Sequence, residues 1–314
     1  MSMDFIIAAI ITVVGISTPI LLAGLGELVV EKSGVLNLGV EGMMLLGAIG
    51  GFGGSVMASM YGLGPLAPWI GVLTGALAGM LGALLFGFFA LTLNSNQVAT
   101  GLALTIFGTG LSSLIGVSFV GRIIPQFGSI FPPELARDPI LKLFFGYSPI
   151  VYFALVMVFA VGWFLRSTRA GLILRAVGEN DLSAHSIGYS VVRVRYAAVA
   201  FGGAMAGIGG AYFSMVITPM WAERMTAGRG WIALALVVFA GWRAGRLLAG
   251  AYFFGVLMAL ELYAKAAGFS ILPSQFWAAM PYLMTVVVLT LISMRDRVGL
   301  NAPACLGKPF LPAT

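Results

Sequence analysis

Residues 42–121 read GMMLLGAIGGFGGSVMASMYGLGPLAPWIGVLTGALAGMLGALLFGFFALTLNSNQVATGLALTIFGTGLSSLIGVSFVG and contain no Asp, Glu, Lys or Arg. A soluble core does not need an uncharged run of this length, whereas each membrane crossing takes about 20 apolar residues. The rest of the chain agrees, because 60% of all residues are hydrophobic and only 9% are charged. The sequence therefore predicts an all-α fold, a polytopic bundle of transmembrane helices in a single domain over residues 1–314.

Uncharged windows recur along the chain and predict about nine spans, within a range of roughly eight to ten. They lie at 5–26, 35–60, 66–93, 97–120, 147–165, 196–218, 229–241, 247–264 and 274–294. The window at 229–241 is short, and the one at 35–60 holds Asn37, Glu41 and a Gly-rich stretch, so both are candidates for broken helices, and whether 35–60 is one helix or a bent pair stays open. The N-terminus lacks a basic segment and a signal cleavage site, so we expect the first span to be retained.

Basic residues gather in three connections that the span count places on one side of the membrane. The positive-inside rule names that side cytoplasmic, with the C-terminus inside, the N-terminus outside and residues 121–146 as an external loop. The net charge of +6 is spread over these short loops, which favours contact with membrane lipid and argues against nucleic acid. The basic residues are Arg166, Arg169, Arg175, Arg193, Arg195, Arg243, Arg246, Arg295, Arg297 and Lys308.

A first polar segment, GELVVEKSGVLNLGVEGMMLLGA at residues 26–48, lies at the junction of two apolar spans. If the second span begins near Val35, Asn37 and Glu41 are four residues apart on one helix face. Gly39 and Gly42 would let the backbone kink or let another helix approach. Two interpretations stay open: the segment lines a path for a solute, or its side chains cap helices and pair with basic groups at the membrane interface.

A second segment, RSTRAGLILRAVGENDLSAHSIGYSVVRVR at residues 166–195, is a long connection on the basic side. Its pattern predicts a short amphipathic helix, a turn centred on Gly178 and a second short helix capped by Asn180 or Asp181. Spans need only a few residues to connect, so this loop indicates a protein partner, with helices resting on lipid headgroups as the alternative. The only histidine, His185, is expected to be an ordinary surface residue.

A third segment, GRGWIALALVVFAGWRAGRLLAGAYFFG at residues 228–255, resembles the first in organisation. Such a weak internal repeat is typical of two halves around a central path. Asn96, Gln97 and other uncharged polar or aromatic residues at the spans suit a neutral solute, or else hydrogen bonds between helices. Small residues are spaced for close helix packing within the chain, or for a subunit interface. They are Gly71, Gly75, Gly79 and Gly82, then Gly202, Gly203, Ala206, Gly209 and Gly210.

The chain lacks the sequence motifs of an ATPase, a zinc protease or a serine hydrolase. It has no Walker A sequence, no H-E-x-x-H and no G-x-S-x-G, and its one cysteine, Cys305, reads as a minor tail residue. We therefore expect no catalytic residue, metal ligand or cofactor, and a motor in another subunit. Two alternatives remain: an ion-coupled secondary transporter, or an intramembrane enzyme that would have to use Glu41 and Glu261 without a histidine.

The three segments, the second extended through AAVAFGGAMAGIGGAY, together resemble the membrane permeases of bacterial ABC importers. The resemblance covers nearly the whole chain and lies in the branched-chain amino acid, ribose and simple-sugar superfamily, closest to its nucleoside and simple-sugar branch. It implies an inner-membrane transport subunit, not an enzyme, that translocates nucleosides or, as second choice, a simple sugar by alternating access. It also implies an ATPase with tandem nucleotide-binding domains, an extracytoplasmic binding protein and a longer permease as heterodimer partner.

The resemblance also assigns roles to residues. The long loop would be the coupling element that docks on the ATPase, and the first segment would border the translocation path. We add the amides Asn96 and Gln97 to the expected path residues, because uncharged polar groups suit a neutral solute. The expected coupling residues are Arg175, Ala176, Gly178, Glu179, Asn180, His185 and Gly188; the expected path residues are Asn37, Gly39, Glu41, Gly42, Asn96 and Gln97.

Overall fold

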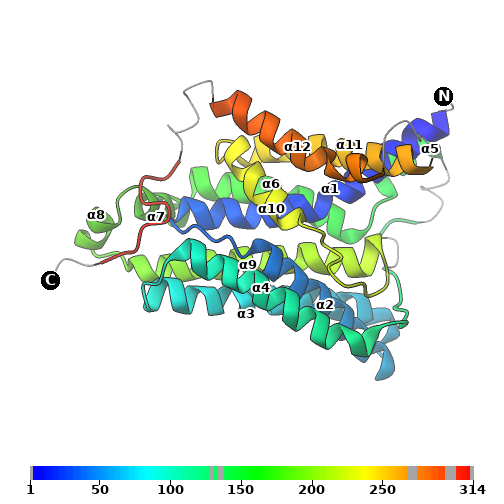
Figure 1. The fold of residues 1–314 in the computed structure, drawn as a ribbon, viewed down its shortest axis with the longest axis horizontal. Coiled ribbons are helices and arrows are strands. Elements are labelled where there is room, and N and C mark those ends of the chain that lie inside the picture. Colours follow the sequence, from blue (N-terminus) through cyan, green and yellow to red (C-terminus); the bar gives the residue numbers. More distant parts are fainter. Residues whose placement is uncertain (1–2, 128–129, 133–137, 267–273, 294–301, 312–314) are drawn as a thin grey trace.

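The computed structural model describes residues 3–127, 130–132, 138–266, 274–293 and 302–311. These residues are helical or irregular, without strands, and form a polytopic bundle as predicted (Figure 1). The α-helices are α1 (Met3–Lys32), α2 (Val40–Met60), α3 (Ala67–Gly87), α4 (Gln97–Gly116), α5 (Pro139–Phe145), α6 (Pro149–Ser167), α7 (Arg169–Glu179), α8 (Asp181–Ser186), α9 (Val191–Tyr212), α10 (Arg229–Phe239), α11 (Ala244–Ala266) and α12 (Ser274–Ser293). Short 3-10 or π turns extend several of them: η1 (Gly64–Leu66), η2 (Phe88–Thr92), η3 (Val117–Phe119) and η4 (Phe213–Ile217).

Seven helical segments in the described part of the chain are long and apolar enough to cross a membrane. They are Phe5–Lys32, Val40–Met60, Gly64–Thr92, Gln97–Phe119, Pro149–Ser167, Val191–Ile217 and Ala244–Ala264. Each matches one predicted span. The other two predicted spans appear as the shorter apolar helices Arg229–Phe239 and Gln275–Val288.

The ends of the bundle separate the loops as the span count predicts. In Figure 1, α7, α8 and the C-terminal segment lie at one end, and α5 and the N-terminus lie at the other. We call the first the α7 end. Residues 128–129 and 133–137 of the predicted external loop, and Arg295 and Arg297, lie outside the described residues. Which end faces the cytoplasm stays a prediction.

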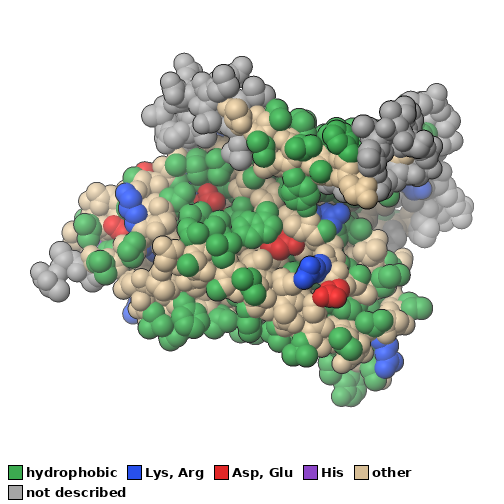
Figure 2. Space-filling view, viewed as in Figure 1, with side chains coloured by type: hydrophobic (Ala, Val, Ile, Leu, Met, Phe, Trp, Pro, Cys, Tyr) green, Lys and Arg blue, Asp and Glu red, His purple; other side chains and the backbone are tan. Residues whose placement is uncertain are grey.

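The outer surface of the bundle is apolar. Large side chains such as Phe159 and Ile106 are 75% and 74% exposed, and Figure 2 shows hydrophobic side chains over much of one face, with few charged groups among them. In water such a surface would drive aggregation, whereas in lipid it costs nothing.

The interior is built where α2, α3 and α9 pack with their backbones in contact. A Cβ atom on Gly79 of α3 would lie 2.3 Å from the carbonyl oxygen of Gly203, and one on Gly207 of α9 would lie 2.3 Å from that of Gly75. The small-residue stripes of the third and sixth spans therefore serve packing within the chain.

One local prediction is wrong. The second span begins at Val40 and not near Val35, so Asn37 lies in a non-helical connection, residues 33–39, and shares no helix face with Glu41. The reason is that the Asn37 side chain accepts a hydrogen bond from the backbone N–H of Gly39 at 2.8 Å, a local bond that competes with the helix. From Val40 to Met60 the helix runs unbroken through its glycines, so of the two alternatives left open by the sequence the structure has one helix.

We expect Gly207→Leu to prevent stable folding, because the side chain would have to separate α9 from α3. Overpacking of this kind costs about 3 kcal/mol or more where backbone cannot move. Gly110→Leu is the matched control, since a Cβ atom on Gly110 of α4 meets nothing within 4 Å. Thermal unfolding in detergent should show a much lower melting temperature for Gly207→Leu and an unchanged one for Gly110→Leu. Equal melting temperatures of the two variants would contradict the close packing of α9 on α3.

Candidate functional site

The site is organised around α10, a short helix whose first turn lies inside the bundle next to Glu41 of α2. One carboxylate oxygen of Glu41 accepts from the Thr226 hydroxyl at 2.6 Å and from the Gly228 N–H at 2.8 Å, and the other accepts from the Gly230 N–H at 2.6 Å. Only 6% of Glu41 is exposed. The carboxylate therefore satisfies the free N–H groups at the start of α10 and neutralises the positive end of its dipole.

A second carboxylate of the first segment holds the other end of α10. Glu31, in the last turn of α1, accepts a hydrogen bond of 2.6 Å from the indole N–H of Trp242, and both residues are buried. Trp242 follows α10 in a tight turn with a φ of 54°. The first and third sequence segments, which the sequence places around a common path, thus bond to each other at both ends of this helix.

The 33–39 connection is fixed by α1 and α4. The Gln97 side chain accepts from the Leu36 N–H at 2.8 Å, and the Thr105 hydroxyl donates to the Leu38 carbonyl at 3.1 Å. One carboxylate oxygen of Glu27 accepts from the Asn37 N–H at 3.3 Å, while the other is buried and has no hydrogen-bond partner among the described residues. These contacts fix the non-helical conformation of the residues before α2.

The expected path residues are not all together. Asn37, Gly39, Glu41 and Gly42 meet at the start of α2, and Gln97 reaches them from α4 through Leu36. Gly42 packs directly on α4, because a Cβ atom there would lie 2.5 Å from the carbonyl oxygen of Leu104. Asn96 lies apart at the surface, where its side chain accepts from the Ala99 N–H at 3.0 Å and caps α4.

The predicted loop at 166–195 contains two helices, α7 and α8. Asn180 separates them and caps α8, since its side chain accepts from the Ser183 N–H at 2.9 Å, which confirms the predicted cap. The predicted turn at Gly178 is wrong: Gly178 lies in the last turn of α7. It is glycine because α7 crosses the end of α1 there, and a Cβ atom would lie 2.3 Å from the Lys32 carbonyl oxygen.

A buried arginine joins the two helices to the rest of the α7 end. Arg195 of α9, 1% exposed, forms an ion pair of 3.1 Å with Asp181 of α8 and donates to the Ser33 carbonyl at 3.3 Å. It also donates to the Lys308 carbonyl at 3.3 Å. From the sequence, Arg195 is interpreted only as a loop charge; its position directly before the apolar window at 196–218 was the available signal.

The C-terminal segment, residues 302–311, crosses the same surface. The Cys305 N–H donates to the Gly178 carbonyl at 2.9 Å, and the Gly307 N–H donates to the Gly34 carbonyl at 3.1 Å. Farther along, the Phe310 ring lies 5.4 Å from the ring of the exposed His185. No sequence pattern predicted that this tail joins α7, α8 and the 33–39 connection.

The remaining expected coupling residues lie on the same surface. Arg175 and Ala176 are half-buried on α7, Glu179 is exposed at its end, and Gly188 lies in an exposed turn after α8 with a φ of 95°.

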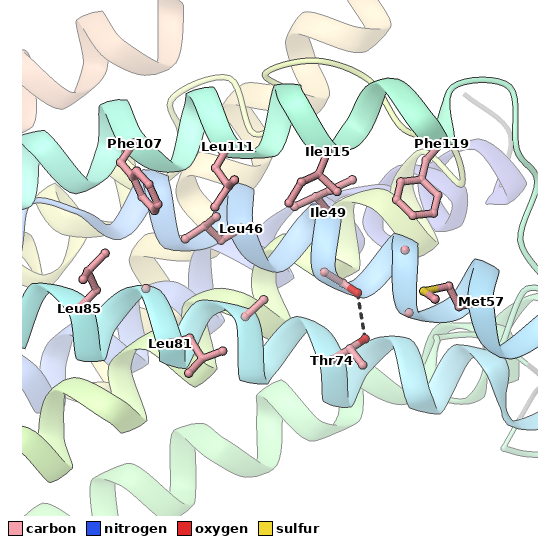
Figure 3. Close-up of a pocket in the computed structure, with 15 residues that line it drawn as sticks. Leu46, Ile49, Met57, Thr74, Leu81, Leu85, Phe107, Leu111, Ile115 and Phe119 are labelled. Atoms are coloured by element: carbon pink, nitrogen blue, oxygen red, sulfur yellow. Dashed lines mark hydrogen bonds between the residues drawn. The ribbon is translucent and has the colours of Figure 1, made fainter.

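A large cavity lies elsewhere, between α2, α3 and α4. It measures about 640 Å³ and is lined by apolar side chains; Phe107 and Leu111 of α4 point into it toward α2 and α3 (Figure 3). The hydroxyl of Thr74 is occupied, because it donates to the Gly50 carbonyl at 2.9 Å. None of the expected path residues lines this cavity. Its apolar lining suits an acyl chain or a neighbouring helix rather than a hydrophilic solute.

Residues 9–289 match the family described as the branched-chain amino acid transport system permease component. The chain belongs to this family. It is therefore a multi-pass membrane transport component and not an enzyme. The resemblance noted from the sequence is confirmed.

Three relatives cover most of the chain. A permease protein named for glucose ABC transport in Haloferax volcanii is 39% identical over 97% of this chain and 97% of its own length. A guanosine ABC transporter permease of Bacillus subtilis is 31% identical over 94% and 93%. A nucleoside ABC transporter permease of Lactococcus lactis is 30% identical over 88% and 89%.

We expect Glu41→Ala to destabilise the protein by about 3 kcal/mol or more, because it leaves buried backbone donors at the start of α10 without an acceptor. Glu223→Ala serves as the control: Glu223 belongs to the same segment before α10, but it is exposed and accepts one bond from the Ser113 hydroxyl. The measurement is thermal unfolding of both variants in detergent. Equal stability would mean that the Glu41 carboxylate does not hold α10.

Proposed function

We propose that the protein is the permease subunit of an ATP-driven ABC importer that moves a nucleoside or a simple sugar by alternating access. One observation carries the proposal: a continuous connection runs from α8 to α10 in the interior, through the bonds of Arg195 to Asp181 and Ser33, the backbone of residues 33–39 and the bonds of Glu41. Family membership and the three relatives supply the transporter class.

In this proposal the ATPase binds α7 and α8 on the cytoplasmic side. Leu182 and Ile187, on and just after α8, are 49% and 72% exposed. Exposed apolar side chains beside Glu179 and Asn180 form a surface that combines an apolar centre with polar surroundings, as protein interfaces do. The C-terminus then lies inside and the N-terminus outside.

Movement of the ATPase would reach the interior through Arg195 and Gly178. Arg195 bonds to both α8 and the 33–39 connection, so a displaced α8 pulls on the residues before α2. Because Gly178 has no side chain, α7 packs directly against the end of α1, which gives a second contact through which the movement could pass. The connection leads within two residues to Glu41, which holds the start of α10.

The start of α10 would border the translocation path. Half-helices that end inside a bundle commonly line substrate sites in transporters. Around this one, the guanidinium of Arg229 lies 4.7 Å from the Phe213 ring, and the Tyr282 hydroxyl donates to the Ala227 carbonyl. Asn37, Gly39, Glu41 and Gly42 then shape the wall of the path by positioning α10, and Gln97 holds that wall from α4.

The other subunits follow from the class of transporter. A second, longer permease chain would pair with this one, and the two chains together would enclose the path. An ATPase with tandem nucleotide-binding domains would drive transport, and an extracytoplasmic binding protein would deliver the solute. Two relatives are named for guanosine or nucleoside transport, which supports a nucleoside. The 39% identical relative is named for glucose, which supports a simple sugar as second candidate.

Uptake by the assembled transporter tests the function. The complex in proteoliposomes, with its binding protein, should accumulate a labelled nucleoside or glucose only when ATP is present on the ATPase side. Guanosine, adenosine, uridine, glucose and ribose form the panel. Uptake that persists without the ATPase and follows an imposed ion gradient would identify a secondary transporter and refute the proposal.

We expect Ile187→Asp to abolish ATP-dependent uptake and to reduce copurification of the ATPase at least tenfold, because the charge falls on the proposed docking surface. The chain should remain folded, since Ile187 is exposed. Ile123→Asp is the control, because Ile123 is 89% exposed in the segment at the opposite end of the bundle. If both variants transport normally, or if Ile123→Asp is the harmful one, the docking assignment fails.

A further inference from the structure

A basic cavity of about 450 Å³ opens at the α7 end, between α1, α6, α7 and the turn that precedes α11. We call it the basic pocket. Each of these four elements contributes one cationic side chain to its lining: Lys32 from α1, Arg166 from α6, Arg175 from α7 and Arg243 from the turn. Its volume lies within the roughly 300–1,000 Å³ range of small-molecule sites.

The charges around the basic pocket do not balance within the described residues. Two carboxylates act on Lys32, those of Glu31 and Glu179, against the four cations of the lining. Glu31 is already bound by Trp242 at 2.6 Å. In the part of the chain that the structure describes, the buried Nε of Arg175 has no hydrogen-bond partner. Like charges held together at an interface repel unless an anion joins them, so the pocket is complementary to a negatively charged group.

The surroundings of the pocket indicate what carries that negative charge. Arg166 lies in the last turn of α6, a membrane-spanning segment. One and two turns earlier, the same face of α6 exposes Trp163 by 65% and Phe159 by 75%. Trp at the headgroup level beside Arg is the arrangement of a membrane interface. A free phosphate would use only the basic residues, whereas a phospholipid would use the basic residues and the apolar stripe together.

We infer that the basic pocket binds the phosphate group of an anionic phospholipid, whose acyl chains lie along Trp163 and Phe159 of α6. Basic pockets between transmembrane helices are known to take such headgroups. Arg175 belongs to α7 and Lys32 to the end of α1, so the lipid would connect the loop helices to the bundle. The lipid would lie in the membrane leaflet at the α7 end. That this leaflet is the cytoplasmic one rests on the proposed function; the binding itself does not.

The experiment is native mass spectrometry of the detergent-purified, full-length transporter, titrated with phosphatidylglycerol and, separately, with phosphatidylcholine. The test variant is R166Q/R243Q, and the control is R169Q/R246Q. The control removes the same charge from exposed residues of neighbouring turns that do not line the pocket. We expect phosphatidylglycerol to bind the wild type and the control equally, and the test variant at least tenfold more weakly. Phosphatidylcholine should show no difference among the three.

Four results would overturn the inference. Equal binding by all three proteins would place the lipid elsewhere, and equal losses in both double variants would show a general charge effect. Displacement of the lipid by millimolar inorganic phosphate would identify a free-anion site, and exclusion of the lipid by the bound ATPase would show that an acidic protein segment fills the pocket. If R166Q/R243Q does not fold, R243Q compared with R246Q gives the same contrast. No step uses ATP or a solute, so failed uptake and failed lipid binding remain distinguishable.

Discussion

The structure depends on one electrostatic requirement: α10 begins inside the bundle, between the buried residues Thr226 and Gly230, so the first N–H groups of the helix need an acceptor within the protein. Glu41 meets that requirement, and the same bonds satisfy a carboxylate that would be costly to bury alone. Neither partner is stable in this place without the other. The start of α2 and the start of α10 are therefore fixed relative to each other, which positions the segments that meet there.

Composition was enough to predict the bundle, because an apolar window long enough to span is recognisable without knowing its neighbours. The start of α2 was not predictable in this way, since the Asn37 side chain bonds to the next turn of the backbone and excludes the helix. The site itself rests on contacts between distant residues, such as Glu31 with Trp242. A single sequence shows both residues but not the pairing, which only the packed fold decides. The interpretation of Glu41 as a helix cap, left open from the sequence, is the one the geometry favours.

The loop helices show the same division. The cap at Asn180 follows from a local pattern and was predicted, whereas the position of Gly178 depends on the crossing with α1 and was not. The position of the C-terminal segment was likewise not predictable, because its bonds to Gly178 and Gly34 use backbone groups that nearly every residue carries. Backbone pairing leaves no signature in residue type.

Arg195 determines how firmly the α7 end holds together. It is fully enclosed, and removal of one member of a buried ion pair costs about 3–5 kcal/mol, because the remaining charge is left without compensation. Separating Arg195 from Asp181 during a conformational change would carry the same penalty. The physically cheaper movement keeps the pair intact and displaces α8, Arg195 and Ser33 as one unit. Bending of the non-helical residues 33–39 breaks no helix ladder, and their bonds to Gln97 and Thr105 would carry the movement on to α4. In the proposed transport cycle, a change that begins at α8 would therefore reach Glu41 through residues 33–39, and α10 would follow because its first turn is bonded to that carboxylate.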